Sequence, residues 1–313
     1  MNRCVFVQAY AKVNLSLDIL NKRTDGYHNL RSVMQSVSLY DRIRLTETEE
    51  GISIDSNHPQ MPCDNSNLAC KAALAFMNAS GIRSGLHIRL AKGIPVAAGL
   101  GGGSADAAAV LRGLNRLWNT GFSIGELQDI GQQLGADVPF CLQGGTLLAE
   151  GFGERLTPVA PVPKLWMVLF KPSFGVSTGE VYAAYDRMGK SHTWATPLML
   201  KGLNQGNPEA VIAAMGNMLE PTTVSLYPRV GEIVQSLKDK GAGKVIMCGS
   251  GPTVCAVFSE REAAENLYNR CSDFNGRAFV VHSVSRGGFL LERHLRGEKV
   301  GTKKAFTYTT GKL

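Results

Sequence analysis

The sequence predicts an α+β protein with two domains. Strand-like and helix-like segments alternate through the first half, and PVAPVP at 158–163 places three prolines between two apolar segments. The second half has the order βαββαβ, which is typical of a ferredoxin-like domain. The 313 residues are enough for two hydrophobic cores. We therefore expect an N-terminal domain over 1–157, a C-terminal domain over 164–291 and a mobile basic tail over 292–313.

Periodicity and turn signals define the elements of the first half. Period-two alternation over 5–20 predicts one long strand or a strand pair, and the alternation continues into two further strands. Ser123 and Glu126 form a capping box at the start of a helix for which Gly135 is a plausible stop. The expected strands are 32–48, 51–56 and 86–99, and the expected helices are 67–81, 104–118 and 123–135.

The second half supplies the ferredoxin-like pattern in order. Apolar segments at 165–170, 244–249, 253–258 and 278–284 predict strands, the middle two joined across a glycine turn, GSGP. Helical periodicity predicts helices at 178–188, 227–241 and 260–271, with further helical pieces between the first two.

Composition indicates a globular protein and gives little support to nucleic acid as a partner. Apolar residues make up 44% of the chain and charged residues 19%, and no apolar run approaches the roughly 20 residues of a membrane span. Six Lys or Arg against two Glu place +4 of the +7 net charge in residues 292–313. The seven cysteines are scattered without a CxxC, which predicts buried free thiols rather than a zinc site. We expect a cytoplasmic protein.

A glycine-rich turn followed by a helix, PVAAGLGGGSADAAAVL at 95–111, is a candidate phosphate site. Unpaired N–H groups and the positive end of the helix dipole attract anions there, and glycine lets a ligand approach the backbone. A dinucleotide fingerprint starting at Gly99 would need Gly or Ala at position 104, which is Ser104. No Gly-Lys pair has the surroundings of a P-loop. The alternative is a tight strand-to-helix turn that binds nothing.

Three other short stretches carry polar groups in positions that a site could use. Asp137 in GADVPF follows a helix stop, and Lys12 and Asn14 lie two apart on a strand and therefore on one face. GSGPT at 249–253 is a second glycine turn. Taken singly, these are also compatible with a solvated loop aspartate, a polar rim and an ordinary hairpin.

Together, in this order, the four stretches resemble the GHMP small-molecule kinases. The resemblance covers about residues 5–290. The segment AKVNLSLDILNKRTDGYHNLRSVMQSV at 11–37, with its Asp-Gly-Tyr-His motif, is similar to a branch that phosphorylates a cytidine-diphosphate-linked sugar alcohol in the non-mevalonate route to isoprenoids. The resemblance implies an N-terminal domain like domain 2 of ribosomal protein S5, a ferredoxin-like C-terminal domain, and transfer of the ATP γ-phosphoryl group to the C2 hydroxyl of that alcohol.

The resemblance also implies roles for individual residues. Asp137 takes the place of the catalytic base and Lys12 that of its electrostatic partner. Substrate binding falls to Asn14, Tyr27, His28, Thr178 and Tyr182, with Tyr185 as the alternative aromatic. ATP binding is assigned to the glycine loop and to Asn65 and Asn67, although these two asparagines could instead form an Asx turn and helix cap. The full ATP-binding set is Pro95, Val96, Ala97, Ala98, Gly99, Leu100, Gly101, Gly102, Gly103, Ser104, Ala105, Asn65 and Asn67.

The implied cofactors are ATP and Mg²⁺, whose ligands the sequence does not define beyond Ser104 as a candidate. The expected partners are small molecules only, without nucleic acid or membrane, and the expected state is a monomer or weak homodimer. One alternative is a GHMP kinase of another small alcohol, of the homoserine or mevalonate type. A remote one is an RNA-binding protein, which would leave Asp137 and Lys12 without a role.

Overall fold

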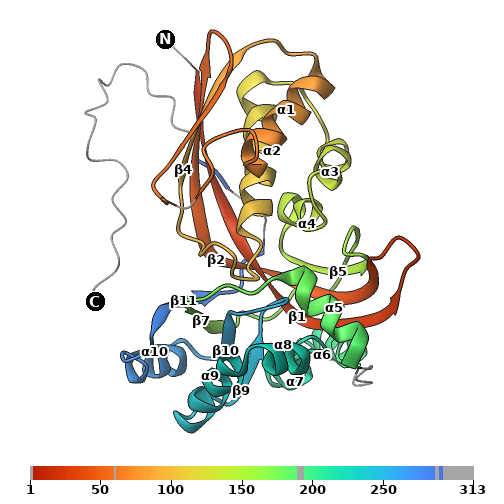
Figure 1. Ribbon diagram of the computed structural model, residues 1–313, viewed down its shortest axis with the longest axis vertical. Coiled ribbons are helices and arrows are strands. Elements are labelled where there is room, and N and C mark those ends of the chain that lie inside the picture. The colour runs from red at the N-terminus through yellow and green to blue at the C-terminus, as the bar shows by residue number, and fades with distance from the viewer. Residues whose placement is uncertain (1–2, 60, 189–193, 286–288, 292–313) are drawn as a thin grey trace.

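The computed structural model describes residues 3–59, 61–188, 194–285 and 289–291, and the tail expected at 292–313 lies outside them. Two sheets organise these residues (Figure 1). Eight described strands form the first sheet, and four form the second. None of the helices in these ranges combines the length and the apolar character that crossing a bilayer requires.

Two long antiparallel strands form the centre of the first sheet. The period-two pattern at 5–20 belongs to one strand, β1 (Cys4–Lys22), which pairs with β2 (His28–Thr48) along nearly its whole length. Strands β4 (Gly85–Ala91) and β5 (Thr146–Gly151) pair with different parts of β2. Strand β3 (Ile52–Ser56) pairs with β4, and β6 (Arg155–Pro158) pairs with β5. Strands β8 (Gly216–Asn217) and β12 (Phe289–Leu291) pair with β1.

Helices cover one face of the first sheet, with α2 packed along β1 and β2 (Figure 1). These helices are α1 (Leu68–Ser80), α2 (Gly102–Trp118), α3 (Ile124–Gln132) and α4 (Val138–Gln143). The capping box of Ser123 and Glu126 is present at the start of α3. The stop expected at Gly135 is wrong, because α3 ends at Gln132 and a short turn leads into α4, which the sequence reading missed.

The second sheet confirms the ferredoxin-like prediction. Its strands are β7 (Trp166–Pro172), β9 (Lys244–Met247), β10 (Val254–Phe258) and β11 (Gly276–His282), and they lie in the order β11-β7-β10-β9 with antiparallel neighbours. The helices of the second half are α5 (Thr178–Met188), α6 (Thr196–Gln205), α7 (Pro208–Ala214), α8 (Glu220–Leu226), α9 (Pro228–Asp239) and α10 (Arg261–Arg270).

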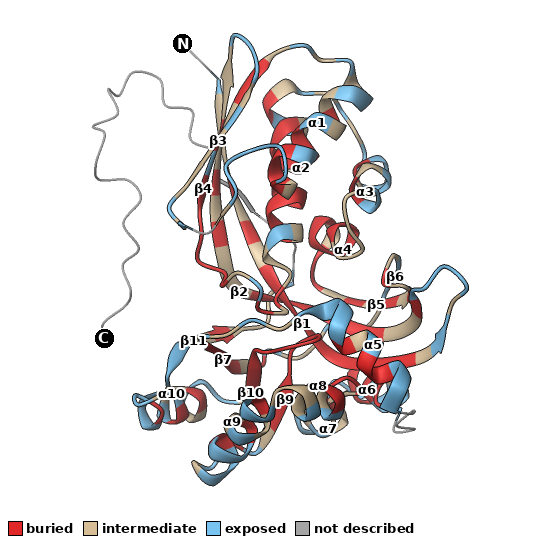
Figure 2. Cartoon of the chain, viewed as in Figure 1, coloured by how far each residue is buried: buried red, intermediate tan, exposed pale blue. Residues whose placement is uncertain are grey.

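The two halves share their cores. Met199 and Leu203 of α6 pack in the larger cluster with β1 and β2, whereas Leu17 and Ile19 of β1 pack in the smaller cluster of the second sheet. Figure 2 shows buried residues along the lower part of β1, where the two sheets meet. Strands β8 and β12, from beyond the proline-rich stretch, pair with β1. The first sheet therefore includes strands from both sides of the proline-rich stretch, whereas all four strands of the second sheet come after it.

Five of the seven cysteines are buried free thiols, as the sequence predicts; the exceptions are Cys4, which is partly buried, and Cys63, which is exposed.

Candidate active site

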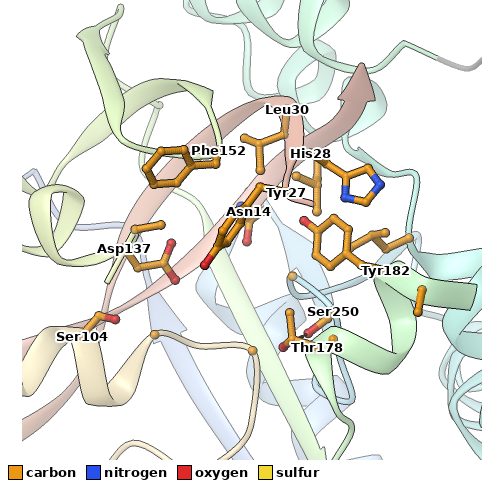
Figure 3. Close-up of a pocket in the computed structure, with 18 of the residues that line it drawn as sticks. Asn14, Tyr27, His28, Leu30, Ser104, Asp137, Phe152, Thr178, Tyr182 and Ser250 are labelled. Carbon is orange, nitrogen blue, oxygen red and sulfur yellow. Dashed lines mark hydrogen bonds between the residues drawn. The ribbon is translucent and has the colours of Figure 1, made fainter. Parts of the chain in front are cut away.

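A cavity of about 580 Å³ lies where β1, the glycine turn and helix α5 meet. Figure 3 shows side chains from these elements directed into it. The proposed catalytic pair and all five proposed substrate residues line the cavity, together with part of the glycine loop. In sequence order, these shared members are Lys12, Asn14, Tyr27, His28, Gly99, Gly101, Ser104, Asp137, Thr178 and Tyr182.

Lys12 is the charged centre of this cavity. Its Nζ donates to Asn14 Oδ1 at 3.0 Å and lies 3.3 Å from Asp137 Oδ2. The Lys12 side chain is only 7% exposed, whereas that of Asp137 is 33% exposed. A buried ammonium needs such partners because burying an unpaired charge costs a large free energy. Lys12 therefore holds the Asp137 carboxylate by charge while leaving part of it open to a ligand.

The local backbone explains how these side chains are aimed. The β1–β2 register shifts between Tyr10 and Lys12 and again between Asn14 and Ser16, and such bulges re-aim side chains beside active sites. Asn14 Nδ2 donates to Ser32 Oγ at 2.8 Å, which turns the amide oxygen toward Lys12. The same-face prediction for Lys12 and Asn14 is confirmed.

Asp137 occupies the N-cap position of α4 but does not cap it. Its side chain makes no hydrogen bond to the helix N–H groups, and a proline stands in the first turn of the helix. An N-cap aspartate normally uses its oxygens for the helix. Here the carboxylate faces Lys12 and the cavity instead (Figure 3).

The glycine loop borders both this cavity and a second one of about 280 Å³. Helix α2 begins after Gly101, which has φ +69° and no side chain to cap the first N–H groups. A Cβ at Gly101 would lie 2.9 Å from Lys12 Cγ, so glycine lets the lysine pack against the loop. The smaller cavity is lined by Met61, Leu68, Lys92, Pro95, Val96, Ala97, Ala98, Gly99, Gly101, Gly102, Gly103 and Ser104.

Four of the proposed ATP residues line neither cavity. Leu100 and Ala105 are buried in the larger core. Asn67 is the N-cap of α1, where its Oδ1 accepts from Ala69 N and its Nδ2 donates to the Pro62 carbonyl. Asn65 lies in the preceding turn. The Asx-cap interpretation is thus confirmed for Asn67, whose side-chain groups are engaged within the protein.

The second glycine turn packs directly against the first. Gly99 has φ +75°, and a Cβ there would overlap the carbonyl oxygen of Cys248. Asn217 Nδ2 donates to the carbonyls of Met247 and Gly249, at 2.8 and 2.7 Å. The GSGPT turn is therefore a wall of the site, and its contact with Gly99 joins the two sheets there.

Helix α5 connects this turn to the aromatic end of the cavity. Thr178 Oγ1 and Ser250 Oγ, 2.8 Å apart, form a hydrogen bond (Figure 3). One helical turn further, Tyr182 lines the cavity, whereas Tyr185 is buried in the smaller core cluster. Burial and the negative charge of Asp137 raise the pKa of Tyr182, so its phenol stays neutral.

His28 and Tyr182 form a tilted ring pair with centroids 5.0 Å apart. His28 Nε2 lies 2.7 Å from Asp186 Oδ1, and Lys22 Nζ lies 2.7 Å from the other oxygen of Asp186. Burial works against ionisation of Asp186, but the bonds from Lys22 and His28 outweigh it and lower the pKa of this carboxyl. These contacts fix the His28 ring behind Tyr182.

Tyr27 is 64% exposed, and its ring lies against Phe152 with centroids 5.7 Å apart. Sequence reasoning missed Phe152, Asp186 and Lys22 as cavity residues, and it singled out the second glycine turn without naming Ser250 within it. Only Asp186 carried a usable signal, because it follows Tyr182 by four residues and therefore lies on the same face of α5.

Comparisons with known proteins show which family this chain is similar to. Residues 67–145 match the family model of the GHMP kinases N-terminal domain, and residues 199–276 match that of the C-terminal domain. The 4-diphosphocytidyl-2-C-methyl-D-erythritol kinase of Pelotomaculum thermopropionicum is 48% identical over 84% of this chain and 92% of its own. The protein of that name from Geobacillus thermodenitrificans is 43% identical over 92% of this chain and 98% of its own.

Solved structures show the same relationship. A crystal structure of 4-(cytidine 5'-diphospho)-2C-methyl-D-erythritol kinase has a TM-score of 0.76 and 33% identity, over 90% of this chain and 99% of the other. The homoserine kinase of Cytophaga hutchinsonii has a TM-score of 0.73 at 20% identity, over 93% and 98% of the two chains, which indicates a shared fold alone.

Proposed function

The chain belongs to the 4-diphosphocytidyl-2-C-methyl-D-erythritol kinases of the GHMP kinase family, and from this premise we propose that Asp137 and Lys12 catalyse its phosphoryl transfer. The reaction uses ATP and belongs to the non-mevalonate route to isoprenoids. The acceptor is the C2 hydroxyl of the cytidine-linked sugar alcohol. The contact of Lys12 with both Asn14 and Asp137, beside the glycine loop, carries this proposal.

Asp137 acts as the base in this scheme. A tertiary alcohol is a weak nucleophile, so a carboxylate within hydrogen-bond reach accelerates attack by accepting its proton as the new P–O bond forms. The partly open Asp137 carboxylate provides that acceptor, and the nearby ammonium of Lys12 holds it in position. Lys12 also offsets the charge that develops on the transferring group.

The glycine loop positions the donor. Gly99, Gly101 and Ser104, at the start of α2, line both cavities, and Gly102 and Gly103 line the smaller one. Helix N-termini bind phosphate through their backbone N–H groups and through the helix dipole. The ATP phosphates placed there would have the γ-phosphoryl group directed toward Asp137 and Lys12.

Mg²⁺ fits this site as an ion carried mainly by the nucleotide. The described residues contain no group of three or more His, Cys, Asp or Glu able to hold a metal. The Ser104 hydroxyl and the Asp137 carboxylate are two protein oxygens among the residues that line the cavity. Mg²⁺ is commonly bound by one or two protein oxygens with phosphates and water completing its shell, and it neutralises phosphate charge.

The aromatic end of the cavity would hold the cytosine. Tyr182 and Tyr27 offer ring faces to the base, and the His28–Asp186 pair keeps the Tyr182 ring in place. Asn14 and Thr178 also line the cavity, where they can bind the sugar alcohol and its diphosphate. The cytoplasmic location, the monomeric or weakly dimeric state and the absence of nucleic-acid binding stay predictions.

The experiment that tests this function measures ADP release with ATP and Mg²⁺ against three acceptors: the cytidine-linked alcohol, homoserine and mevalonate. We expect turnover with the first alone and phosphorus NMR showing a new phosphomonoester on C2. Phosphorylation of another alcohol, with none of the cytidine compound, would overturn the proposal. Salt-sensitive RNA binding that persists in Asp137→Asn would favour the RNA-binding alternative.

A further inference from the structure

A buried ionic cluster lies beneath the glycine loop and outside the catalytic group. The ammonium of Lys92 contacts Asp41 Oδ2 and lies 2.6 Å from Asp106 Oδ2. All three side chains are 3% exposed or less. Burying one cation with two carboxylates has a large desolvation cost, so such a cluster adds little to the free energy of unfolding by itself. The position of each partner shows what the cluster holds.

Asp41 fixes the chain just before the loop. Its second oxygen accepts from Gly93 N at 2.6 Å and from Ile94 N at 2.8 Å. The backbone N–H of Lys92 itself donates to Asn57 Oδ1 at 2.7 Å. Three consecutive backbone N–H groups between β4 and Pro95 are therefore held by side chains from other strands and turns.

Asp106 fixes the chain just after the loop. It lies in the second turn of α2, and the first turn of this helix lines the smaller cavity. Lys92 lines the smaller cavity, and a Cβ at Gly102 would lie 3.5 Å from Lys92 Nζ. Lys92 thus bridges the two ends of the loop through its contacts with Asp41 and Asp106, directly behind the surface where phosphates would lie.

The charge balance of the cluster suits an anion nearby. Burial, followed by the charge of Asp41, raises the pKa of Asp106 well above its usual value, and Asp106 Oδ1 is buried without a hydrogen-bond partner. Burial would lower the pKa of Lys92, but the two carboxylates outweigh it and raise that pKa. With a proton on Asp106 the cluster is neutral and does not repel a phosphate.

We propose that Lys92 is a positioning residue for the kinase reaction: with Asp41 and Asp106 it clamps both ends of the glycine loop before nucleotide binds, so that the loop N–H groups are already arranged for the ATP phosphates. The inference rests on the proposed ATP site. It predicts that the two carboxylates are unequal, because Asp41 holds the backbone as well as the ammonium, whereas Asp106 holds the ammonium alone.

The first test compares Asp41→Asn with Asp106→Asn, using Asp55→Asn on neighbouring β3 as the control. An amide cannot accept from both Lys92 and the 93–94 backbone, so Asp41→Asn loses one set of contacts. In Asp106→Asn the amide oxygen can still accept from Lys92. We expect the Kd of a nonhydrolysable ATP analogue to rise about tenfold or more in Asp41→Asn and about two- to threefold in Asp106→Asn. The KM of the cytidine substrate should change less than about twofold in both.

Two results would overturn the clamp: a folded Asp41→Asn protein with wild-type nucleotide affinity, or equal weakening of both substrates. Nucleotide binding is measured without the acceptor alcohol. A failure of the Lys92 proposal can therefore be distinguished from a failure of the proposed function, in which the wild-type protein would not phosphorylate the cytidine compound.

If Asp41→Asn does not fold, hydrogen exchange on the wild-type protein decides the matter. We expect the Gly93 and Ile94 amides of the nucleotide-free protein to exchange about as slowly as that of Leu90 in β4. The proposal would be overturned if the Gly93 and Ile94 amides of the nucleotide-free protein exchanged as fast as the amide of Gly26 in an exposed turn and slowed only when nucleotide was bound.

Discussion

Replacing Asp137 by Asn tests the central step of the proposed mechanism. The amide keeps the shape of the side chain but cannot take the proton of the alcohol. General bases contribute about 10²–10⁴ in rate, which corresponds to about 3–5 kcal/mol of activation free energy. We expect kcat to fall by that factor, while the KM of each substrate changes less than about threefold, because binding groups remain in place.

The same substitution should leave the fold intact. Lys12 Nζ and Asp137 Oδ2 are 3.3 Å apart, and at an effective dielectric constant of about 20 their Coulomb attraction is about 5 kcal/mol before desolvation and screening. The Asp137 side chain is 33% exposed, and Lys12 keeps Asn14 as an acceptor. The net loss of unfolding free energy is therefore on the order of 1 kcal/mol, or about 1–3 °C in Tm for a chain of this size.

The assay is steady-state ADP release with both substrates varied, beside a thermal melt of each variant. Asp129→Asn is the matched control, because Asp129 is exposed on α3 and does not line the cavity. A folded Asp137→Asn enzyme with near wild-type kcat would remove Asp137 as the base. An equal loss in Asp129→Asn would show that the effect is not specific to the site.

Three further outcomes are expected. Gly99→Ala should destabilise the protein by about 1–3 kcal/mol and weaken ATP binding, because Gly99 has a positive φ and an added Cβ would overlap the backbone of the second glycine turn. The control Gly125→Ala on α3 should be neutral or stabilising. Equal denaturation midpoints for the two variants would refute this expectation. Tyr182→Leu should raise the KM of the cytidine substrate about 5- to 100-fold through lost stacking and leave the KM of ATP unchanged. A rise in the KM of ATP alone would mean that the cytosine ring binds elsewhere. Asp186 has a lowered pKa in the folded protein, so its stabilising contribution is fully present above about pH 4, the pKa of an unfolded aspartate, and disappears as pH falls through the lower folded pKa. The difference in Tm between wild type and Asp186→Asn should therefore close only in strong acid. A difference that widens in strong acid would refute the role of Asp186 as an ionised partner.

Local sequence patterns predicted the elements of the fold well, because period-two and helical spacing report which side of each element is buried. The same logic placed Lys12 and Asn14 on one face of β1. It could not show the register shifts that flank them, since a bulge depends on how two strands pair. Helix α4 was missed because its six residues include a proline and are too few to show a period.

Long-range partners were the other limit of the sequence. Asp186 is 158 residues from His28 along the chain, and Asp41 is 51 residues from Lys92. No local pattern relates such residues, because only the packing of α5 and of β2 brings them together. Lys92 reads as a polar residue at a strand end, where a lysine is ordinarily solvated. A buried ion pair is thus visible only once the fold is known.

The shared cores make a last prediction about domain independence. Residues 1–157 would lack β8, β12 and the α6 side chains Met199 and Leu203, which complete the larger core. Leu17 and Ile19 of β1 would lose the second sheet and face water. Exposing several large apolar side chains costs about 1.5–3 kcal/mol each, which is comparable in sum to the about 5–15 kcal/mol that stabilises a whole domain.

We therefore expect a 1–157 fragment to lack a cooperative thermal transition and to bind a hydrophobic dye, whereas the full chain unfolds cooperatively. Mixing it with a 158–313 fragment should restore the transition if the shared cores are the cause. A sharp transition and native near-ultraviolet circular dichroism in the isolated fragment would contradict this. The site would then have to be regarded as an interface between two independent domains, because β1 carries Lys12 and Asn14 together with apolar side chains that pack in both clusters.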